Sequence, residues 1–167
     1  MSLNIQRLSK AYDRDSFSCG NDSLDRYLKT QARQDLPRNL AQIFVLLDDE
    51  QKTIKGYHTL SAGSLVLSEL PIDLQRKLPR YPKIPVTLLG RLAVDLRFQG
   101  QKLGAILLVD ALQRSARQTE EIASMAVVVD AIDDAAAAFY RKFHFLPLPQ
   151  TPHTLFVEMA TVKKMFE

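Results

Sequence analysis

The stretch RLAVDLRFQGQKLG, residues Arg91 to Gly104, decides how this chain is interpreted. It begins as the end of a strand that we place at Val86 to Val94, and it finishes as the start of an apolar-periodic helix from Leu103 to Arg117. Between the two elements stands a polar turn. A strand, a turn and a helix in this order are typical of an α/β sheet.

The turn holds residues that suit an anion. The first N–H groups of a helix lack partners within the helix, and the macrodipole places roughly +0.5 charge there, so a phosphate is a natural ligand. Gly100 allows close approach of the backbone, Gly104 allows tight packing of the helix start, and Gln99, Gln101 and Lys102 surround them with donors. The pattern is neither a Walker loop nor a dinucleotide fingerprint, because the glycine spacing differs. A tight turn without a ligand is the plainer alternative.

The rest of the chain alternates between strand and helix patterns. Hydrophobic periodicity, caps and turn residues predict the elements before the Val86–Val94 strand: a strand at 3–9, a helix at 24–34, paired strands at 42–49 and 53–67, and a short helix at 72–78. After the Leu103–Arg117 helix they predict a strand at 122–131, a helix at 133–143 and a closing strand at 153–160. This order predicts an α/β fold with a mixed sheet covered by helices on both faces.

Composition limits the class of protein. With 167 residues, 46% hydrophobic and 25% charged, we expect one domain over residues 1–167. One cysteine and three scattered histidines offer neither a disulfide nor a metal site, and no segment resembles a secretory signal or a membrane span, so we expect a cytoplasmic protein.

The net charge is +3, and cations gather in a stretch whose only acids are Glu69 and Asp73. This bias favours an anionic partner, with a solvated basic face as the alternative.

The second half of the chain identifies a family. A strand ending in VVVDA precedes an alanine-rich helix that carries Phe139 and Tyr140. Together with the turn, these segments resemble the GNAT family of acyl-CoA-dependent N-acetyltransferases. The family's pyrophosphate motif is [QR]-x-x-G-x-[GA], and Gln99 to Gly104 matches it at the first and last positions. Lys102 stands where the family has its central glycine; a lysine fits there without strain on the condition that its φ is negative, and its ammonium would add charge for a phosphate.

More narrowly, several segments resemble the GNAT toxins of bacterial toxin–antitoxin pairs. They are FSCGNDSLDRYL, GYHTLSAGSL, LPRYPKIP, GRLAVD with QGQKLG, and DAIDDAAAAFYRKFHF, which together span nearly the whole chain. The resemblance implies the GNAT fold, with a mixed, mostly antiparallel twisted sheet. His144 replaces the glycine of the usual F-G-F, at a helix end where a left-handed residue is favoured.

The resemblance also implies a chemistry. An amine attacks the thioester of acetyl-CoA directly, without a protein nucleophile, and Tyr140 serves as general acid for the departing thiolate; simple packing of its ring is the alternative. No base is identified, and His58 is either that base or a core residue. The cofactor contacts implied by the resemblance are Leu92, Ala93, Val94, Gln99, Gly100, Gln101, Lys102, Leu103, Gly104, Ala105, Asp130, Ala135 and Phe139.

The implied acceptor is the α-amino group of an aminoacyl-tRNA, whose acetylation blocks translation. Candidate phosphate contacts are Arg33, Arg38, Lys77, Arg80, Lys83 and Arg91. Two alternatives stay open: an acetyltransferase of small amines or protein N-termini, and a decayed domain that only binds a partner. The resemblance further implies a ribbon-helix-helix antitoxin and a homodimer.

Overall fold

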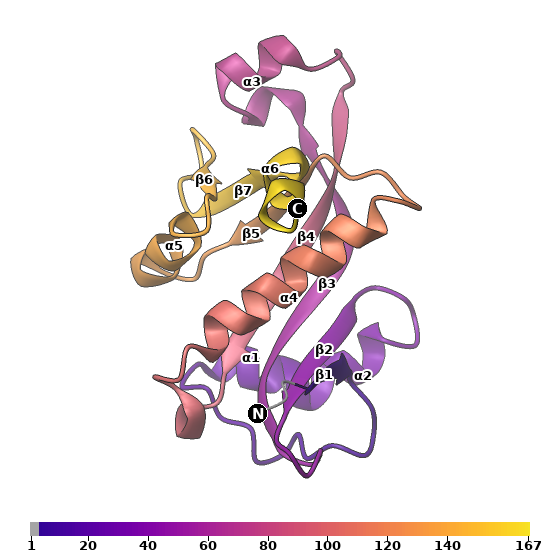
Figure 1. Cartoon of the computed structure of the whole chain (residues 1–167), viewed down its shortest axis with the longest axis vertical. Helices are drawn as coiled ribbons and strands as arrows, with labels where there is room; N and C mark the ends of the chain where they lie inside the picture. Colours follow the sequence, from indigo (N-terminus) through magenta and orange to yellow (C-terminus); the bar gives the residue numbers. More distant parts are fainter. Residues whose placement is uncertain (1–3) are drawn as a thin grey trace. The chain divides into compact units, whose positions relative to one another are not determined.

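The computed structural model describes residues 4–167 (Figure 1). Its strands form a seven-stranded sheet in the order β1-β2-β3-β4-β5-β7-β6. The pairs β1–β2, β2–β3, β5–β7 and β6–β7 are antiparallel, and β4–β5 is parallel. The predicted mixed, mostly antiparallel sheet is therefore confirmed. The strands are β1 (Asn4–Arg7), β2 (Gln42–Leu47), β3 (Ile54–Val66), β4 (Lys83–Val94), β5 (Ala126–Asp130), β6 (Leu146–Pro147) and β7 (Thr154–Glu158).

The α-helices follow the predicted order, with α6 added after the last strand. They are α1 (Asp22–Arg26), a π-helical turn (Tyr27–Gln31), α2 (Ala32–Asp35), α3 (Ile72–Lys77), α4 (Leu103–Gln118), α5 (Asp134–Arg141) and α6 (Met159–Met165), with short 3-10 helices at Leu67–Glu69 and Leu96–Phe98. The sequence did not predict α6 or the two-residue strand β6. The first residue of the predicted strand at 3–9 lies outside the described residues.

The chain divides into two compact units, which we describe separately. The first unit comprises the described residues up to Ser61 together with Gly90–Ala111, and the second comprises Ala62–Leu89 and Leu112–Glu167. The strands β3 and β4 and the helix α4 each run from one unit into the other. The expectation that residues 1–167 act as one domain stays a prediction.

In the first unit, helices cover both faces of β2. Ile43, Val45 and Leu47 belong to a core cluster with Tyr27 and Leu28 of the N-terminal helical segment. Leu46, on the opposite face of the strand, clusters with Leu103 and Leu107 of α4. Because side chains alternate across a strand, this double cover explains why QIFVLL is apolar almost without interruption.

The N-terminal helical segment begins where the sequence predicts. The side chain of Asn21 caps α1 by accepting a hydrogen bond from the Leu24 N–H at 3.1 Å. The helix then widens into the π-helical turn before α2. π-Helical turns are rare and occur often at functional sites, and apolar periodicity does not reveal this one, because the same face of the segment stays buried throughout.

The second unit is built around β5. Its side chains Ala126 and Val128 form a core cluster with Ile84 and Val86 of β4 and with Phe156 of β7. The parallel register between β4 and β5 runs only from Val86↔Ala126 to Leu89↔Val129, although β4 continues to Val94. The last residues of β4 therefore extend beyond its described register with β5.

Candidate active site

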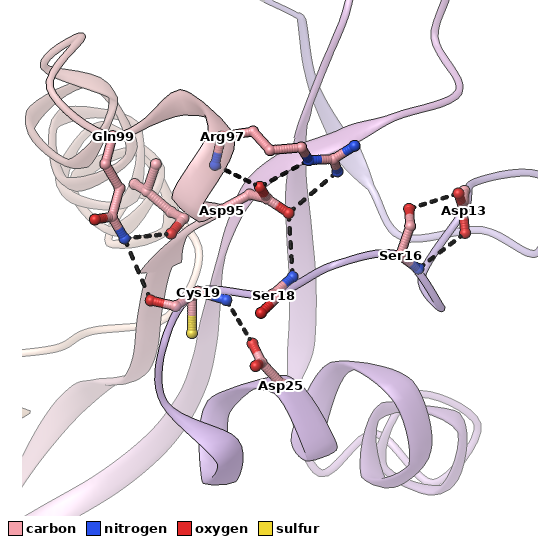
Figure 2. Close-up of polar contacts among 9 residues, drawn as sticks. Asp13, Ser16, Ser18, Cys19, Asp25, Asp95, Arg97 and Gln99 are labelled. Atoms are coloured by element: carbon pink, nitrogen blue, oxygen red, sulfur yellow. Dashed lines mark hydrogen bonds and ion pairs between the residues drawn. The ribbon is translucent and has the colours of Figure 1, made fainter.

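In the first unit, the turn after β4 is anchored by a buried carboxylate (Figure 2). Asp95, whose side chain is 1% exposed, accepts hydrogen bonds from the backbone N–H of Arg97 at 2.9 Å, from its guanidinium at 3.0 and 3.2 Å, and from the Ser18 N–H at 3.1 Å. Burial alone would raise the pKa of this carboxyl, but the bonds from Arg97 and Ser18 outweigh burial and hold the pKa below its ordinary value. Asp95 is therefore a charged anchor for the start of the turn.

A second anchor corrects one part of the sequence interpretation. The side-chain amide of Gln99 donates to the carbonyl oxygen of Val94 at 3.0 Å and to that of Cys19 at 3.2 Å (Figure 2). Its NH₂ group is thus committed to holding the turn in place, and the expectation that it surrounds the glycines as a donor for an anion is wrong. Gln101 and Lys102 remain exposed in the turn.

The backbone of the turn alternates in a way that the sequence interpretation missed. Gly100 has φ 83° and Lys102 has φ 62°, so the condition of a negative φ, under which a lysine fits without strain, is not met. A non-glycine residue in the left-handed region is strained by roughly 1–2 kcal/mol. Left-handed residues in a turn direct successive N–H groups into a concave nest that binds anions, so Lys102 has the conformation that a glycine would take there.

The N–H groups of the turn are available to a ligand. From Gln99 to Ala105, no backbone N–H donates to an acceptor within the part of the chain that the structure describes. A Cβ added to Gly100 would meet no atom within 4 Å, so the space above the turn is open. These N–H groups and the N-terminus of α4 fit the diphosphate of a coenzyme A, which needs several donors and a positive dipole.

The end of β4 presents alternate residues to opposite edges. The Asp95 N–H donates to the Lys55 carbonyl of β3 at 2.8 Å, and a Cβ added at Gly56 would lie 2.8 Å from the Ala93 carbonyl oxygen. The backbone groups of Ala93 therefore face β3, and by alternation those of Leu92 and Val94 face the other edge. Of the three predicted backbone contacts, only Leu92 and Val94 lie on the edge open to an extended ligand.

In the second unit, Tyr140 is held by one aromatic neighbour on α5 and one that follows the helix. Its ring lies 5.2 Å from that of Phe139 and 5.5 Å from that of Phe145, and the residue is 6% exposed. Burial raises the pKa of the phenol to about 12. The hydroxyl makes no hydrogen bond with any residue that the structure describes. A buried tyrosine hydroxyl usually has a partner, so this hydroxyl is a candidate to bond with a ligand.

The other predicted residues of the second unit surround α5. Asp130, at the end of β5, accepts a hydrogen bond from the Thr154 hydroxyl at 2.6 Å, and Ala135 lies exposed in the first turn of the helix. Phe139 packs on Phe143 at 5.3 Å. His144 follows the helix with φ 71°, so it has the left-handed conformation that the position favours.

Two residues with reactive groups are not available for chemistry. The imidazole of His58 is 0% exposed and bonded through Nε2 to Oδ2 of Asp110 at 2.7 Å, as a core histidine would be. Burial, together with a hydrogen bond to Asp25, raises the pKa of the Cys19 thiol to about 11. His58 therefore belongs to the core, and Cys19 stays a thiol at neutral pH.

The six predicted tRNA contacts differ in their surroundings. Arg33 and Arg38 of the first unit are exposed, as are Lys77, Arg80 and Lys83 of the second. Arg91 is half-buried, and its guanidinium lies 3.5 Å from the centre of the Tyr27 ring. Sequence reasoning missed this stack, because the two residues lie far apart in the sequence.

No helix among residues 4–167 is long and apolar enough to cross a membrane. Within the same residues, no group of three or more histidine, cysteine, aspartate or glutamate side chains could hold a metal ion.

Comparison with known proteins agrees with this geometry. The acetyltransferase (GNAT) family matches residues 5–145. A tRNA-acetylating toxin of Mycobacterium tuberculosis (strain ATCC 25618 / H37Rv) is 36% identical over 160 residues, which cover 96% of this chain and 94% of that protein. The structure of AtaT complexed with acetyl-methionyl-tRNAfMet has a TM-score of 0.90 at 27% identity, covering 99% of this chain and all of that one. A tyrosine-to-phenylalanine AtaT variant, bound to the C-terminus of the antitoxin AtaR and acetyl-CoA, has a TM-score of 0.83 at 25% identity, covering 98% of each chain.

Proposed function

Because the chain belongs to the GNAT family of acetyltransferases, we propose that it transfers an acetyl group to the α-amino group of an aminoacyl-tRNA and so blocks translation. The observation that carries the proposal is the row of unpaired N–H groups from Gln99 to Ala105, at the start of α4. Such a row suits a ligand with several negative charges, which coenzyme A provides. The similarity to a tRNA-acetylating toxin and to AtaT with its acetylated tRNA supports the choice of acceptor.

The first unit would hold the cofactor. The N–H groups of Gly100 to Ala105 would bind its diphosphate, and the exposed ammonium of Lys102 adds charge at the same turn. The backbone groups of Leu92 and the N–H of Val94, on the open edge of β4, would pair with its extended arm, whereas the Val94 carbonyl oxygen already accepts the Gln99 amide. Acetyl-CoA supplies the activated acetyl group when it is bound. Fixed donors of this kind favour the charge that develops on an acyl oxygen.

In the second unit, Tyr140 is the proposed general acid. Its hydroxyl keeps its proton at neutral pH, because burial raises its pKa to about 12. A free tyrosine is already a weaker acid than a thiol by about 2 kcal/mol, and burial widens this gap. Tyr140 therefore stabilises a departing thiolate by donating a hydrogen bond rather than by complete transfer of its proton. Asp130, Ala135 and Phe139 are proposed as further cofactor contacts.

The acceptor surface is proposed from charge. Arg33, Arg38, Lys77, Arg80, Lys83 and Arg91 would contact tRNA phosphates, so binding should weaken as salt concentration rises. The alternative of a decayed binding domain was considered because Lys102 and His144 stand at positions where the family has glycines. Both have the left-handed backbone that glycine would supply, with φ 62° and 71°, so these replacements preserve the local conformation.

We further propose an antitoxin partner and a homodimer. The structure of AtaT with the C-terminus of AtaR supports the first, and the partner would be of the ribbon-helix-helix type. A homodimer would spread the basic surface over two copies of this chain. The cytoplasm, where charged tRNA and acetyl-CoA occur together, is the proposed place of action.

The proposal is tested with labelled acetyl-CoA and a pool of tRNAs, half of it charged and half deacylated. Label should enter the charged half only, and mild base, which cleaves the aminoacyl ester, should release it as N-acetyl amino acid. Polyamines and short peptides in parallel reactions test the other acceptors. Labelling of these, with charged tRNA unlabelled, would refute the assignment.

A further inference from the structure

Arg91 lies on a stack of aromatic rings in the first unit. Its guanidinium carbon is 3.5 Å from the centre of the Tyr27 ring. The Tyr27 ring is stacked in turn on Tyr57, with centroids 6.4 Å apart and planes at 10°. Tyr57 is 0% exposed and its hydroxyl donates to the Leu24 carbonyl at 2.7 Å. The stack is therefore fixed in the core and places the arginine in one position.

The nearby carboxylate is already occupied. One oxygen of Asp35 accepts the Tyr27 hydroxyl at 2.7 Å, and the other accepts the Gln31 amide at 3.1 Å. Hydrogen bonds from Tyr27 and Gln31, and the charges of Arg91 and Arg38, hold the pKa of Asp35 below its ordinary value. Both oxygens of Asp35 are therefore engaged by Tyr27 and Gln31, and Arg91 acts on this carboxylate only through its charge.

The donors of Arg91 are not used within the chain. Its guanidinium makes no hydrogen bond and no ion pair with any residue that the structure describes. The five predicted tRNA contacts other than Arg91 are exposed, whereas Arg91 is half-buried and stacked. An arginine that is ordered by packing loses little entropy when it binds, and its planar fork matches two oxygens of a phosphate.

The position of Arg91 suggests which phosphate. Arg91 directly precedes Leu92 on β4, the first of the residues on the edge open to the acetyl-bearing arm. An acceptor amine must reach that edge, and in an aminoacyl-tRNA the amine is separated from the last phosphodiester by one nucleoside. Building on the proposed function, we propose that Arg91, stacked on Tyr27, binds the 3′-terminal phosphodiester of the aminoacyl-tRNA. It would be a specificity residue that separates tRNA from small amines.

The first test is binding without acetyl-CoA. An RNA minihelix with an amide-linked amino acid at its 3′ end is titrated by fluorescence anisotropy between 50 and 200 mM salt. Arg91→Met should weaken binding about tenfold or more and lower the slope of log K against log salt by about 0.7–1. Arg91→Lys keeps the charge but loses the fork, so it should lose affinity and keep the slope. Arg26→Met, an exposed cation of α1, is the matched control for both quantities.

The second test is kinetic and uses a substrate without the phosphate. Arg91→Met should lower kcat/KM for the aminoacyl minihelix about tenfold or more, while kcat/KM for 3′-O-aminoacyl-adenosine changes less than about threefold. The KM for acetyl-CoA should stay unchanged in both reactions. Equal losses of kcat/KM on the two substrates would overturn the proposal. A slope of log K against log salt in Arg91→Met equal to that of the parent would also overturn it, because it would indicate that Arg91 stacks on an RNA base and does not bind a phosphate. A parent enzyme that binds the minihelix but acetylates neither substrate would refute the proposed function instead, and the binding test would still decide the role of Arg91.

Discussion

The side-chain amide of Gln99 donates to the carbonyl oxygen of Val94 at 3.0 Å and so ties the turn to the end of β4. The same amide reaches the Cys19 carbonyl at 3.2 Å, far back in the sequence. The nest of N–H groups is therefore held against two parts of the first unit before any ligand arrives. Prior order of this kind reduces the entropy lost on binding.

Replacing Gln99 should loosen the row of backbone N–H groups in the turn. Gln99→Glu places a carboxylate, which cannot donate, against two carbonyl oxygens, so we expect the Kd for coenzyme A to rise about tenfold by calorimetry. Gln101→Glu adds the same charge to the turn without breaking a tie and should weaken binding less. An equal loss in both variants would show that charge, and not the anchoring of the turn, accounts for the effect.

Lys102 offers a test of the backbone. Because it has φ 62°, Lys102→Gly should relieve left-handed strain and raise the free energy of unfolding by about 0.5–1 kcal/mol, after the entropy of the extra glycine is subtracted. Lys102→Ala removes the same ammonium but keeps the strain, so it should not stabilise. Thermal and urea unfolding measure the difference. Equal stability of the glycine and alanine variants would contradict the strained conformation.

Tyr140→Phe should leave the fold intact and lower turnover by about 10²-fold or more. No hydrogen bond within the described residues is lost, because the hydroxyl has no partner there. Unfolding temperature and coenzyme A affinity should match those of the parent. Tyr81→Phe, at a tyrosine that is 65% exposed in the same unit, is the control. A turnover within about threefold of the parent would remove Tyr140 from catalysis.

The pH profile follows from the raised pKa of Tyr140. Burial favours the neutral phenol and moves its pKa to about 12, so the phenol keeps its proton through the neutral and mildly alkaline range. The single-turnover rate should therefore rise through about pH 8, as the α-amino group of the substrate loses its proton, and should reach a plateau by about pH 9. A fall in rate between about pH 8 and about pH 9 that is absent in Tyr140→Phe would mean that the Tyr140 phenol ionises in that range.

Much of the fold could be predicted from local patterns, because each signal lies within a few neighbouring residues. The helical segment predicted at 24–34 is present and is capped by Asn21, and the apolar run of β2 matches a strand covered on both faces. The π-helical turn and α6 were not predicted, since the spacing of apolar residues in each segment gives no separate signal. The Gly100 turn was predicted, but a sequence gives no φ, so the left-handed conformation of Lys102 was not predicted.

The sequence singled out residues of the candidate site, but it did not reveal the contacts that define what each residue does. Gln99 and Arg91 were both singled out, yet their functions depend on partners that lie far away in the sequence, Cys19 for one and Tyr27 for the other. Such pairings arise only when the chain folds. The edge to which the Ala93 backbone points likewise depends on its neighbour β3. Residue types therefore singled out the candidate site, and tertiary contacts separate its anchors from the groups proposed to bind a ligand.

The acceptor group is tested most directly by the mass of the 3′ end of the tRNA. After reaction with acetyl-CoA carrying a heavy-isotope acetyl group, nuclease digestion releases the terminal aminoacyl-adenosine for mass spectrometry. We predict that this fragment gains one heavy acetyl group on its α-nitrogen, and that the gain is absent from deacylated tRNA. An unchanged fragment in a reaction that consumes acetyl-CoA would contradict the account.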